Sequence, residues 1–381
     1  MTANVRTASG RAHVLILELS MPMPRTLFIA AAAMVLAACG SSDAIVPDSP
    51  PDAAAKWAAV DSVVRAQIAT AGGASALTLS VHDRSDVPKF ERSYGGFSPD
   101  TRLAVASASK LIAGMVLLDV IARGELSLTS TTGAVLGWTG ARGTITLEQL
   151  LSFTSGLDNQ NACTFNALVT LAQCVATIST QPVVAAPGTR FDYGSTHLHV
   201  AARMAEVASG KSWNTLFRER LAEPLGLASG VRYYTLPNQA VGESNPLVAG
   251  GLRASARDYG KLLALAYHNG RVGSVTLATP ALFAAQAREP FPGVVIGSSP
   301  YGTPLPVFRY GLGAWLECAT PASGCPSISS AGLFGFTPWL DRSSGYYATI
   351  AMEQLDGRAT AFSVRLQQAV KPFIVAALRA N

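Results

Sequence analysis

The chain of 381 residues is 49% hydrophobic and 14% charged, which excludes intrinsic disorder and a coiled coil as its main state. Its length suits one large domain or two intertwined domains with a sizeable core. The formal net charge is +5 without a run of Lys and Arg residues, so we expect no nucleic-acid partner.

The N-terminal segment is typical of a secretory signal. Arg25 is followed by the uncharged stretch Leu27–Ala38, and such signals combine a positive start, a short apolar stretch and small residues before a cleavage site. The stretch of about 12 residues is too short to span a bilayer, which takes about 20. We therefore expect residues 1–38 to be a signal peptide, with Met21 or Met23 as the true start, because a signal needs no residues before them.

Cys39 stands at the expected cleavage site. The run Leu36–Gly40 resembles a bacterial lipoprotein signal, in which the Cys is lipidated and becomes the first residue of the mature protein. In such proteins an Asp after the Cys favours the inner membrane, whereas Gly40 favours the outer membrane. The resemblance implies a lipid anchor in the periplasm of a bacterial envelope, a Pro-rich tether over 39–52 and a folded domain over 53–381. The alternative is an ordinary cleaved signal in which Cys39 has no role.

The folded domain begins with signals for a helix, a hairpin and a second helix. Apolar residues recur every three or four positions over Trp57–Ile68, which predicts a helix. Ala76–Val81 and Phe90–Tyr94 are apolar or alternating and flank Asp83–Asp86, which predicts a β-hairpin. The strongly apolar segment Lys110–Ala122 predicts the second helix.

The middle of the chain reads as helices separated by Gly and Pro residues, and strand patterns return near its end. The expected helices are 147–153, 165–177, 196–209, 213–221 and 256–268. The expected strands are Tyr310–Glu317, Ser327–Trp339 and Tyr346–Met352, before a helix Ala361–Leu378 that Pro372 kinks or restarts. Strands at both ends predict an α+β fold, with one sheet domain and an inserted helical domain over about 124–305.

Four cysteines remain besides Cys39, and their spacing favours two disulfides. Four cysteines allow three connectivities, but the pairs Cys163–Cys174 and Cys318–Cys325 would each close a short loop. Each bond would stabilise the fold by about 2–3 kcal/mol. Metal binding is the alternative, but neither pair has a Cys-x-x-Cys spacing or a nearby His. We therefore expect disulfides and no metal site.

A catalytic motif stands at the start of the apolar helix. The sequence contains neither Gly-x-Ser-x-Gly nor His-Glu-x-x-His, and we expect His197 and His199 to be structural. Ser107-Ala108-Ser109-Lys110 places a Ser and a Lys on one helix face, where a neutral Lys can take the proton of the Ser hydroxyl. Apolar neighbours and the helix N-terminus both lower the pKa of Lys110. The alternative is a Ser-rich helix start with a Lys in solvent.

Four later segments, in order, resemble motifs that accompany Ser-x-x-Lys in one enzyme family. Leu150–Leu157 reads Leu-Leu-Ser-Phe-Thr-Ser-Gly-Leu, close to Leu-Leu-x-His-Thr-Ser-Gly-Leu. Phe191–Ser195 matches a Tyr-x-Asn motif with Ser for Asn, and Gly250–Asp258 matches a Gly-Gly-Leu segment before a helix. Ser330–Gly335 stands where the family has Lys-Thr-Gly or His-x-Gly on an inner strand. The family is that of the penicillin-recognising Ser-x-x-Lys hydrolases: class C beta-lactamases, D-Ala-D-Ala carboxypeptidases and family VIII carboxylesterases.

The resemblance extends over most of residues 57–379 and implies a beta-lactamase-like fold, an antiparallel sheet flanked by helices, and no cofactor. It implies that Ser107 attacks a carbonyl and becomes acylated, while Lys110 and Tyr193 share the general-base work, Tyr193 as a phenolate-like group or as a proton relay. The backbone N–H groups of Ser107 and Leu333 would form the oxyanion hole. The implied substrate-binding residues are Ser195 (in place of the Asn), Ser330, Gly332 and Leu333.

One departure from the family bears on the substrate. Ser330-Ala331-Gly332 has no Lys to receive the carboxylate of a beta-lactam or of a peptide, and only Arg309 or Arg342 could replace it. Because such a charge-assisted contact is worth about 1.5–3 kcal/mol, we expect a small-molecule ester or amide as substrate, as in the carboxylesterases. A beta-lactamase or D-Ala-D-Ala carboxypeptidase is the alternative. An alternative of another class is an acyl-accepting sensor or binding module.

Apolar residues near the last motif have two possible interpretations: they line a pocket for the apolar acyl or alcohol group of a substrate, or they form the core of the sheet. These residues are Trp315, Leu333, Phe334, Phe336 and Trp339.

Overall fold

The structure of the protein, a computed structural model, describes residues 51–70, 76–303 and 305–380, and of residues 51–54 the backbone. These residues belong to one unit, Ser49–Asn381. The expected signal peptide, Cys39 and the expected tether up to residue 50 lie outside the described residues, and the first helix begins at Pro51, within the end of the expected tether. No helix in the described ranges is long and apolar enough to cross a membrane.

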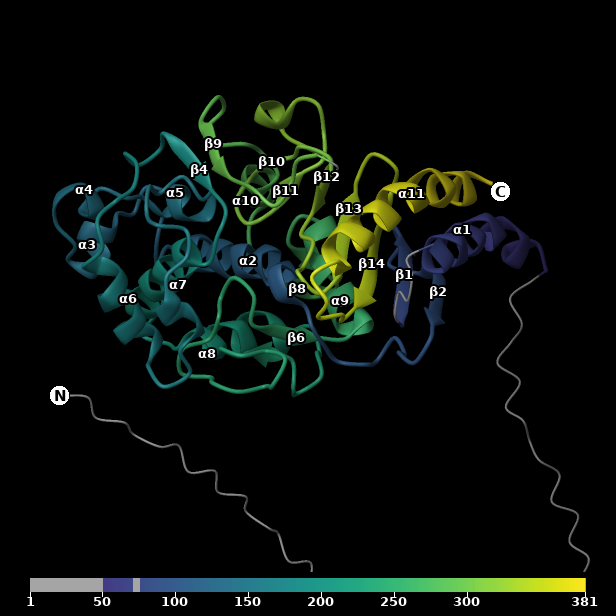
Figure 1. Cartoon of the computed structure of the whole chain (residues 1–381), viewed down its shortest axis with the longest axis horizontal. Coiled ribbons are helices and arrows are strands. Elements are labelled where there is room, and N and C mark those ends of the chain that lie inside the picture. Colours follow the sequence, from purple (N-terminus) through teal and green to yellow (C-terminus); the bar gives the residue numbers. More distant parts are fainter. Residues whose placement is uncertain (1–50, 71–75, 304, 381) are drawn as a thin grey trace, which may run out of the picture. The chain divides into compact units, whose positions relative to one another are not determined.

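A seven-stranded antiparallel sheet joins the two ends of the domain (Figure 1). Its order is β10-β11-β12-β13-β14-β1-β2, so the expected N-terminal hairpin is present and pairs with β14 through β1. The predicted α+β fold with an antiparallel sheet is confirmed. The strands are β1 Leu77–Asp83, β2 Pro88–Tyr94, β10 Arg309–Tyr310, β11 Trp315–Leu316, β12 Ser327–Ser329, β13 Thr337–Asp341 and β14 Tyr346–Met352.

Two of the expected strands are each a pair of shorter ones. Residues 310–317 contain the end of β10 and all of β11, and Gly313 turns the chain between them with φ 87°. Residues 327–339 contain β12 and the start of β13, and Gly335 has φ 93° in the turn between them. Glycine adopts this left-handed backbone without a steric penalty. The turns were not predicted because the residues on both sides of each one are apolar, which reads as one continuous strand.

Helices cover both faces of the sheet (Figure 1). α1 (Pro51–Thr70) and α11 (Ala359–Arg379) pack together, and α9 (Ala256–Tyr267) packs on β1, β13 and β14. Alternate residues of β14 serve the two faces, because side chains alternate along a strand. Ile350 lies in the core with α1 and α11, whereas Tyr347 and Ala351 lie in the core with α9.

The structure refines two expectations about the helices. Of the two outcomes expected at Pro372, a kink or a restart, the restart does not occur, because α11 runs through Pro372 as one helix. Val370 and Ile374 are fully buried on either side, and their packing outweighs one lost hydrogen bond. The helix expected over 165–177 begins only at Leu171, because Thr170 and Gln173 form a capping box that starts α6 there.

The helical region is built around α2 (Ser109–Ala122), which is buried on nearly every side, as is typical of a helix that is apolar all round. Asp119 of this helix is 1% exposed and forms ion pairs with Arg123 and Arg220. Because α9 lies within 124–305 and yet packs on the sheet, the expected insertion is not one separate helical block.

The remaining helices and turns are the 3₁₀ turn Ala106–Ala108, α3 Thr132–Leu136, α4 Gly140–Gly143, α5 Leu147–Leu151, the 3₁₀ turn Ala162–Phe165, α6 Leu171–Ser179, α7 Thr196–Ser209, α8 Trp213–Phe217, the π-turn Arg218–Ala222, α10 Pro280–Gln286 and the 3₁₀ turn Pro321–Ser323. The remaining strands are β3 Leu103–Ala104, β4 Arg190–Asp192, β5 Arg232–Tyr233, β6 Leu252–Ala254, β7 Arg271–Val272, β8 Val275–Thr276 and β9 Val295–Ser298. They form the sheets β3-β6-β5, β4-β9 and β7-β8.

Candidate active site

Ser107 and Lys110 face each other at the start of α2. Lys110 Nζ donates hydrogen bonds to Ser107 Oγ at 3.0 Å and to the carbonyl oxygen of Ala249 at 2.8 Å. Lys110 is only 4% exposed, so the alternative of a Lys in solvent is wrong. Burial lowers the pKa of Lys110 to about 7, because a low-dielectric environment disfavours the ammonium form. An appreciable fraction of this amine is therefore neutral near pH 7, and only the neutral form can accept a proton.

A tight turn brings Ser107 to this position. The chain leaves β3 and enters α2 through the 3₁₀ turn Ala106–Ala108, and Ala106 has φ 47°. A residue other than Gly in this region costs of order 1–3 kcal/mol and is concentrated at functional sites. Ser330 Oγ donates to the carbonyl oxygen of Ser107 at 2.9 Å and fixes the turn from the side of the sheet.

Tyr193 is the third member of the group. Lys110 Nζ lies 4.6 Å from the centroid of its ring, and the ring stacks on that of Trp315 with centroids 5.0 Å apart. Burial raises the pKa of Tyr193, and the side chains of Ser107 and Trp315 lower it only in part. Because its pKa is raised, Tyr193 is a neutral phenol at working pH. Of the two roles expected for it, the proton relay is therefore favoured and the phenolate-like base is not.

Asn159, which the sequence analysis did not identify, holds the segment that carries Tyr193. Its Nδ2 donates to the carbonyl oxygen of Tyr193 at 2.9 Å, and its own carbonyl oxygen accepts from the backbone N–H of Ser195 at 2.9 Å. A Cβ on Gly194 would lie 1.9 Å from that carbonyl oxygen, so only Gly fits between them. Asn159 lies two residues beyond the Leu150–Leu157 motif, which gives no signal for its role.

Both histidines are buried, as expected of structural residues. His197 uses both ring nitrogens, with Ser155 Oγ and the carbonyl oxygen of Asp192 each at 2.8 Å. Burial lowers the pKa values of His197 and His199 to about 4. Neither ring lines the cleft at Ser107, so neither stands where it could act on a substrate there.

The resemblance implies an Asn that bonds to the Lys where this chain has Ser195, and Ser195 does not make that contact. Its Oγ lies 3.1 Å from Thr164 Oγ1, and the second hydrogen bond of Lys110 goes to the carbonyl oxygen of Ala249. Ala249 directly precedes the Gly250–Asp258 motif, which was the only sequence signal for this neighbourhood. A backbone carbonyl, which any residue type supplies, cannot be identified from side-chain identity.

Two backbone N–H groups remain for an oxyanion. Among the hydrogen bonds of the described residues, none uses the N–H of Ser107 or of Leu333 as a donor, and the first N–H groups of a helix have no partner within it. Gly332 joins the two segments closely, since a Cβ there would lie 2.2 Å from the carbonyl oxygen of Val105. Ser330–Gly332 follows β12 rather than lying in the strand, because the chain turns so that the N–H of Gly332 bonds to Phe336.

These groups open into a cleft of about 510 Å³. Among the described residues that line it, Lys110 is the only charged one. Of the apolar residues singled out from the sequence, Leu333 and Phe334 line the cleft, whereas Trp315, Phe336 and Trp339 are core residues. The lining residues are Ala106, Ser107, Lys110, Gln160, Phe165, Tyr193, Gly194, Ser195, Thr235, Leu236, Pro237, Asn238, Gln239, Leu247, Ala249, Gly250, Leu333, Phe334 and Leu355.

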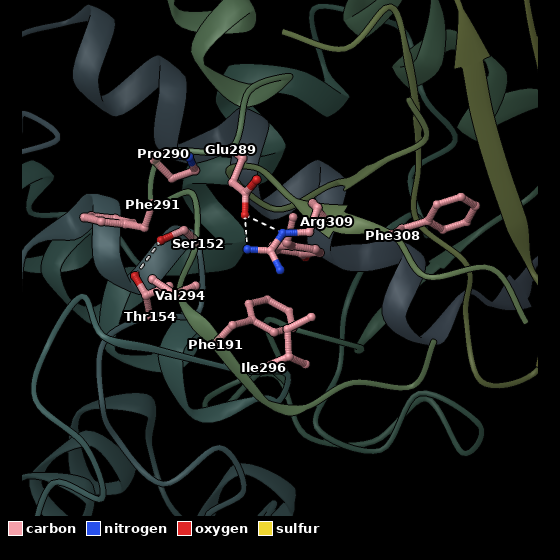
Figure 2. A pocket seen from close by; sticks show the side chains of 11 residues that line it. Ser152, Thr154, Phe191, Glu289, Pro290, Phe291, Val294, Ile296, Phe308 and Arg309 are labelled. Carbon is pink, nitrogen blue, oxygen red and sulfur yellow. Dashed lines mark hydrogen bonds and ion pairs between the residues drawn. The ribbon is translucent and has the colours of Figure 1, made fainter. Parts of the chain in front are cut away.

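Neither expected substitute for the missing cation reaches the cleft. Arg309 forms an ion pair with Glu289 in a separate small pocket beside Phe191 (Figure 2). Arg342 donates to the carbonyl oxygens of Ala266 and Tyr267 at the end of α9. A substrate carboxylate in the cleft would therefore meet neither guanidinium.

Both expected disulfides are present. Cys163–Cys174 has a Cα–Cα distance of 5.3 Å and joins the 3₁₀ turn Ala162–Phe165 to α6. Cys318–Cys325 has a Cα–Cα distance of 5.7 Å and closes the connection between β11 and β12. The predicted pairing is confirmed.

Comparison with known proteins agrees with the geometry. The family model described as Beta-lactamase matches residues 60–369. The structure of a candidate beta-lactamase from Bacteroides dorei is 31% identical, with a TM-score of 0.73, over 83% of this chain and 98% of its own. A family VIII carboxylesterase of known structure is 17% identical and shares the fold, with a TM-score of 0.66 over 84% of this chain and 97% of its own.

One curated relative matches over a shorter region. Penicillin-binding protein 4 of Amycolatopsis lactamdurans is 30% identical over 148 residues, which are 37% of this chain and 38% of that protein's length. The family match, by contrast, extends from α1 to α11, and the Bacteroides structure aligns along nearly its whole length. The likeness is thus not confined to one motif, and the chain belongs to the beta-lactamase family.

Proposed function

We propose that this protein is a serine hydrolase that cleaves an ester or amide through an acyl-enzyme on Ser107, with uncharged esters as its preferred class. The observation that carries the proposal is the buried amine of Lys110, 3.0 Å from Ser107 Oγ. Its pKa is lowered to about 7, and in the part of the chain that the structure describes no carboxylate lines the cleft beside it. A base matched to the working pH is the requirement for activating a Ser hydroxyl.

The reaction follows from this arrangement. Neutral Lys110 takes the proton of Ser107 while Oγ forms a bond to the substrate carbonyl carbon. The N–H groups of Ser107 and Leu333 stabilise the negative oxygen, a contribution of about 3–4 kcal/mol for one such donor in comparable enzymes. The carbonyl re-forms, and the bond to the alcohol breaks as Tyr193 passes the alcohol a proton that Lys110 replaces. Water then repeats these steps against the acyl-enzyme and releases the acid.

The preference for esters rests on charge. A beta-lactam and a peptide C-terminus each carry a carboxylate, and the described lining of the cleft contains no Arg and no Lys other than Lys110. A carboxylate there would lose its water without gaining a partner, which costs several kcal/mol for an ion. An ester has no such charge to desolvate. The similar proteins include a carboxylesterase and a penicillin-binding protein. An experiment therefore has to distinguish hydrolysis of an uncharged ester from reaction with a beta-lactam or a peptide.

We also propose that the protein is exported and anchored by a lipid on Cys39 in the periplasm. The signal-like N-terminus and the Cys39 context support this. The two disulfides agree with it, because such bonds form and persist in oxidising compartments.

The experiment compares wild type with Ser107→Ala on p-nitrophenyl butyrate, a D-Ala-D-Ala peptide and a chromogenic cephalosporin. Ser98→Ala is the control, since Ser98 is exposed and outside the cleft. We expect wild type and control to hydrolyse the butyrate and Ser107→Ala to lose that activity. Faster turnover of the cephalosporin or the peptide would contradict the ester preference. A wild type as inactive as Ser107→Ala on all three would favour an acyl-accepting sensor or binding module.

A further inference from the structure

Exposed apolar side chains gather in the cleft in front of Ser107. Phe165 is 46% exposed, Leu333 57% and Leu355 67%, and all three line the cleft. They come from three separate segments of the chain, so no single local turn accounts for their exposure. Apolar groups left exposed together in a concave site are typical of a surface that contacts an apolar ligand.

The polar groups of the same lining are almost all uncharged. Asn238 and Gln239 supply amides, and Thr235 supplies a hydroxyl. The one cation among the described lining residues, Lys110, is already hydrogen-bonded to Ser107 and to Ala249. Such a site can bind an apolar group and orient a neutral one. It has no spare partner for an ion.

The wall that carries Phe165 is held on both sides. This wall, Asn161–Thr170, is called the Phe165 loop. Asn245 Nδ2 donates to the carbonyl oxygens of Cys163 at 2.8 Å and of Asn166 at 3.0 Å, the residues two before and one after Phe165. Thr164 Oγ1 lies 3.1 Å from Ser195 Oγ, and the bond from Cys163 to Cys174 ties the loop to α6. A wall that is ordered before binding loses little entropy when a substrate arrives.

The loop contains its own control residue. Leu168 is 94% exposed and does not line the cleft, whereas Phe165, three residues earlier, does. The two side chains are both large and apolar, in one loop, but only one of them faces the cleft.

We propose that the Phe165 loop selects the substrate and that Phe165 is the specificity-determining contact for a large uncharged apolar group on the acyl or the alcohol side of an ester. This inference rests on the proposed function. Burying one methylene group raises kcat/KM about fourfold, so the rate should climb steeply with chain length until the cleft is filled.

Two ester series test the inference and distinguish the two sides of the ester. The acyl series is p-nitrophenyl acetate, butyrate and octanoate, and the alcohol series is ethyl, butyl and octyl acetate followed by pH-stat. We expect kcat/KM to rise about fourfold per methylene in at least one series. Phe165→Ser should flatten that rise and lower kcat/KM for the longest ester about tenfold or more, with the shortest ester within about threefold of wild type. Leu168→Ser should keep the rise.

The disulfides supply a second matched pair. Cys163→Ser with Cys174→Ser should raise KM for the longest ester and leave kcat on the shortest ester near that of wild type. Cys318→Ser with Cys325→Ser should change neither, because this second bond lies outside the cleft lining. Thermal unfolding of each variant establishes that it is folded, and if a disulfide pair fails to fold, Phe165→Ser decides alone.

Any of three results overturns the inference. The first is a wild type that hydrolyses the shortest esters but shows no rise in either series. The second is a Phe165→Ser variant that keeps the wild-type rise. The third is a Leu168→Ser variant that loses the rise as fully as Phe165→Ser. A wild type that hydrolyses no ester of either series contradicts the proposed function, and the inference falls with it.

Discussion

A Lys110→Arg variant keeps a positive charge beside Ser107 but cannot release a proton in the working pH range. In the wild type, burial lowers the pKa of Lys110 from 10.5 to about 7. At about 1.36 kcal/mol per pKa unit, this difference favours the neutral amine by about 5 kcal/mol relative to an exposed Lys. The 4% exposure of Lys110 leaves little solvent to screen this effect.

The lowered pKa sets the expected pH profile. Wild-type kcat/KM on a neutral ester should rise through about pH 7 to a plateau, and at pH 6 it should be about one tenth of the plateau value. The buried histidines cannot produce this limb, because burial lowers the pKa values of His197 and His199 to about 4. The limb should therefore report Lys110.

The assay is initial-rate hydrolysis of p-nitrophenyl butyrate from pH 5 to 9. Lys110→Arg should lose about 10²–10⁴-fold in kcat, the usual contribution of a positioned general base. Lys211→Arg is the control, since Lys211 only pairs with Glu219 at a partly exposed site. Retention of more than about a tenth of wild-type turnover by Lys110→Arg, or a wild-type profile without a limb near pH 7, would refute the assignment.

Lys110→Met separates loss of the base from loss of the fold. Between about pH 7 and 10.5 the unfolded wild type binds more protons at Lys110 than the folded state does, because the folded pKa is the lower one. The free energy of unfolding of the wild type should therefore rise with pH in this window. In Lys110→Met this contribution is absent, so the variant should be inactive and, below about pH 10, at least as stable as wild type by urea unfolding.

Three further predictions concern the rest of the chain. Intact-mass spectrometry of membrane-fraction protein should find acyl chains on Cys39, and an unmodified N-terminus elsewhere would reject lipidation. Non-reducing peptide mapping of exported protein should recover both disulfides, and free thiols at these four cysteines would contradict the pairing. Asp119→Ala should lower the free energy of unfolding by about 1–3 kcal/mol, because Arg220, 9% exposed, loses its contact with Asp119 and keeps only Glu125; a loss under about 0.5 kcal/mol in urea unfolding would show that this ion pair is dispensable.

Much of the fold could be predicted because its signals are local. α7 and β14 match the expected residues 196–209 and 346–352, since each is one uninterrupted apolar pattern. The paired strands of 310–317 and 327–339 could not be predicted, because glycine turns interrupt patterns that remain apolar on both sides. α6 begins at Leu171 because Thr170 and Gln173 cap it there, and a prediction based on the spacing of apolar residues does not take such polar caps into account.

The candidate site divides in the same way. Ser107 and Lys110 were identified because their contact lies within one helical turn, and Tyr193 because its motif resembles that of a family. Ala249 contributes a backbone carbonyl and Asn159 holds a backbone segment, so neither role depends on a recognisable motif. Phe165 reaches the cleft through a loop fixed by tertiary contacts, which no local pattern encodes.

The most direct test of the account is covalent labelling with an uncharged fluorophosphonate, whose phosphorus is attacked by an activated Ser Oγ with loss of fluoride. Mass spectrometry should find one adduct per chain, on the peptide that contains Ser107, and the labelling rate should rise through about pH 7 as Lys110 loses its proton. Lys110→Met should label slowly at every pH from 5 to 9. An adduct on another residue, or no adduct in a protein that hydrolyses esters, would contradict Ser107 as the nucleophile.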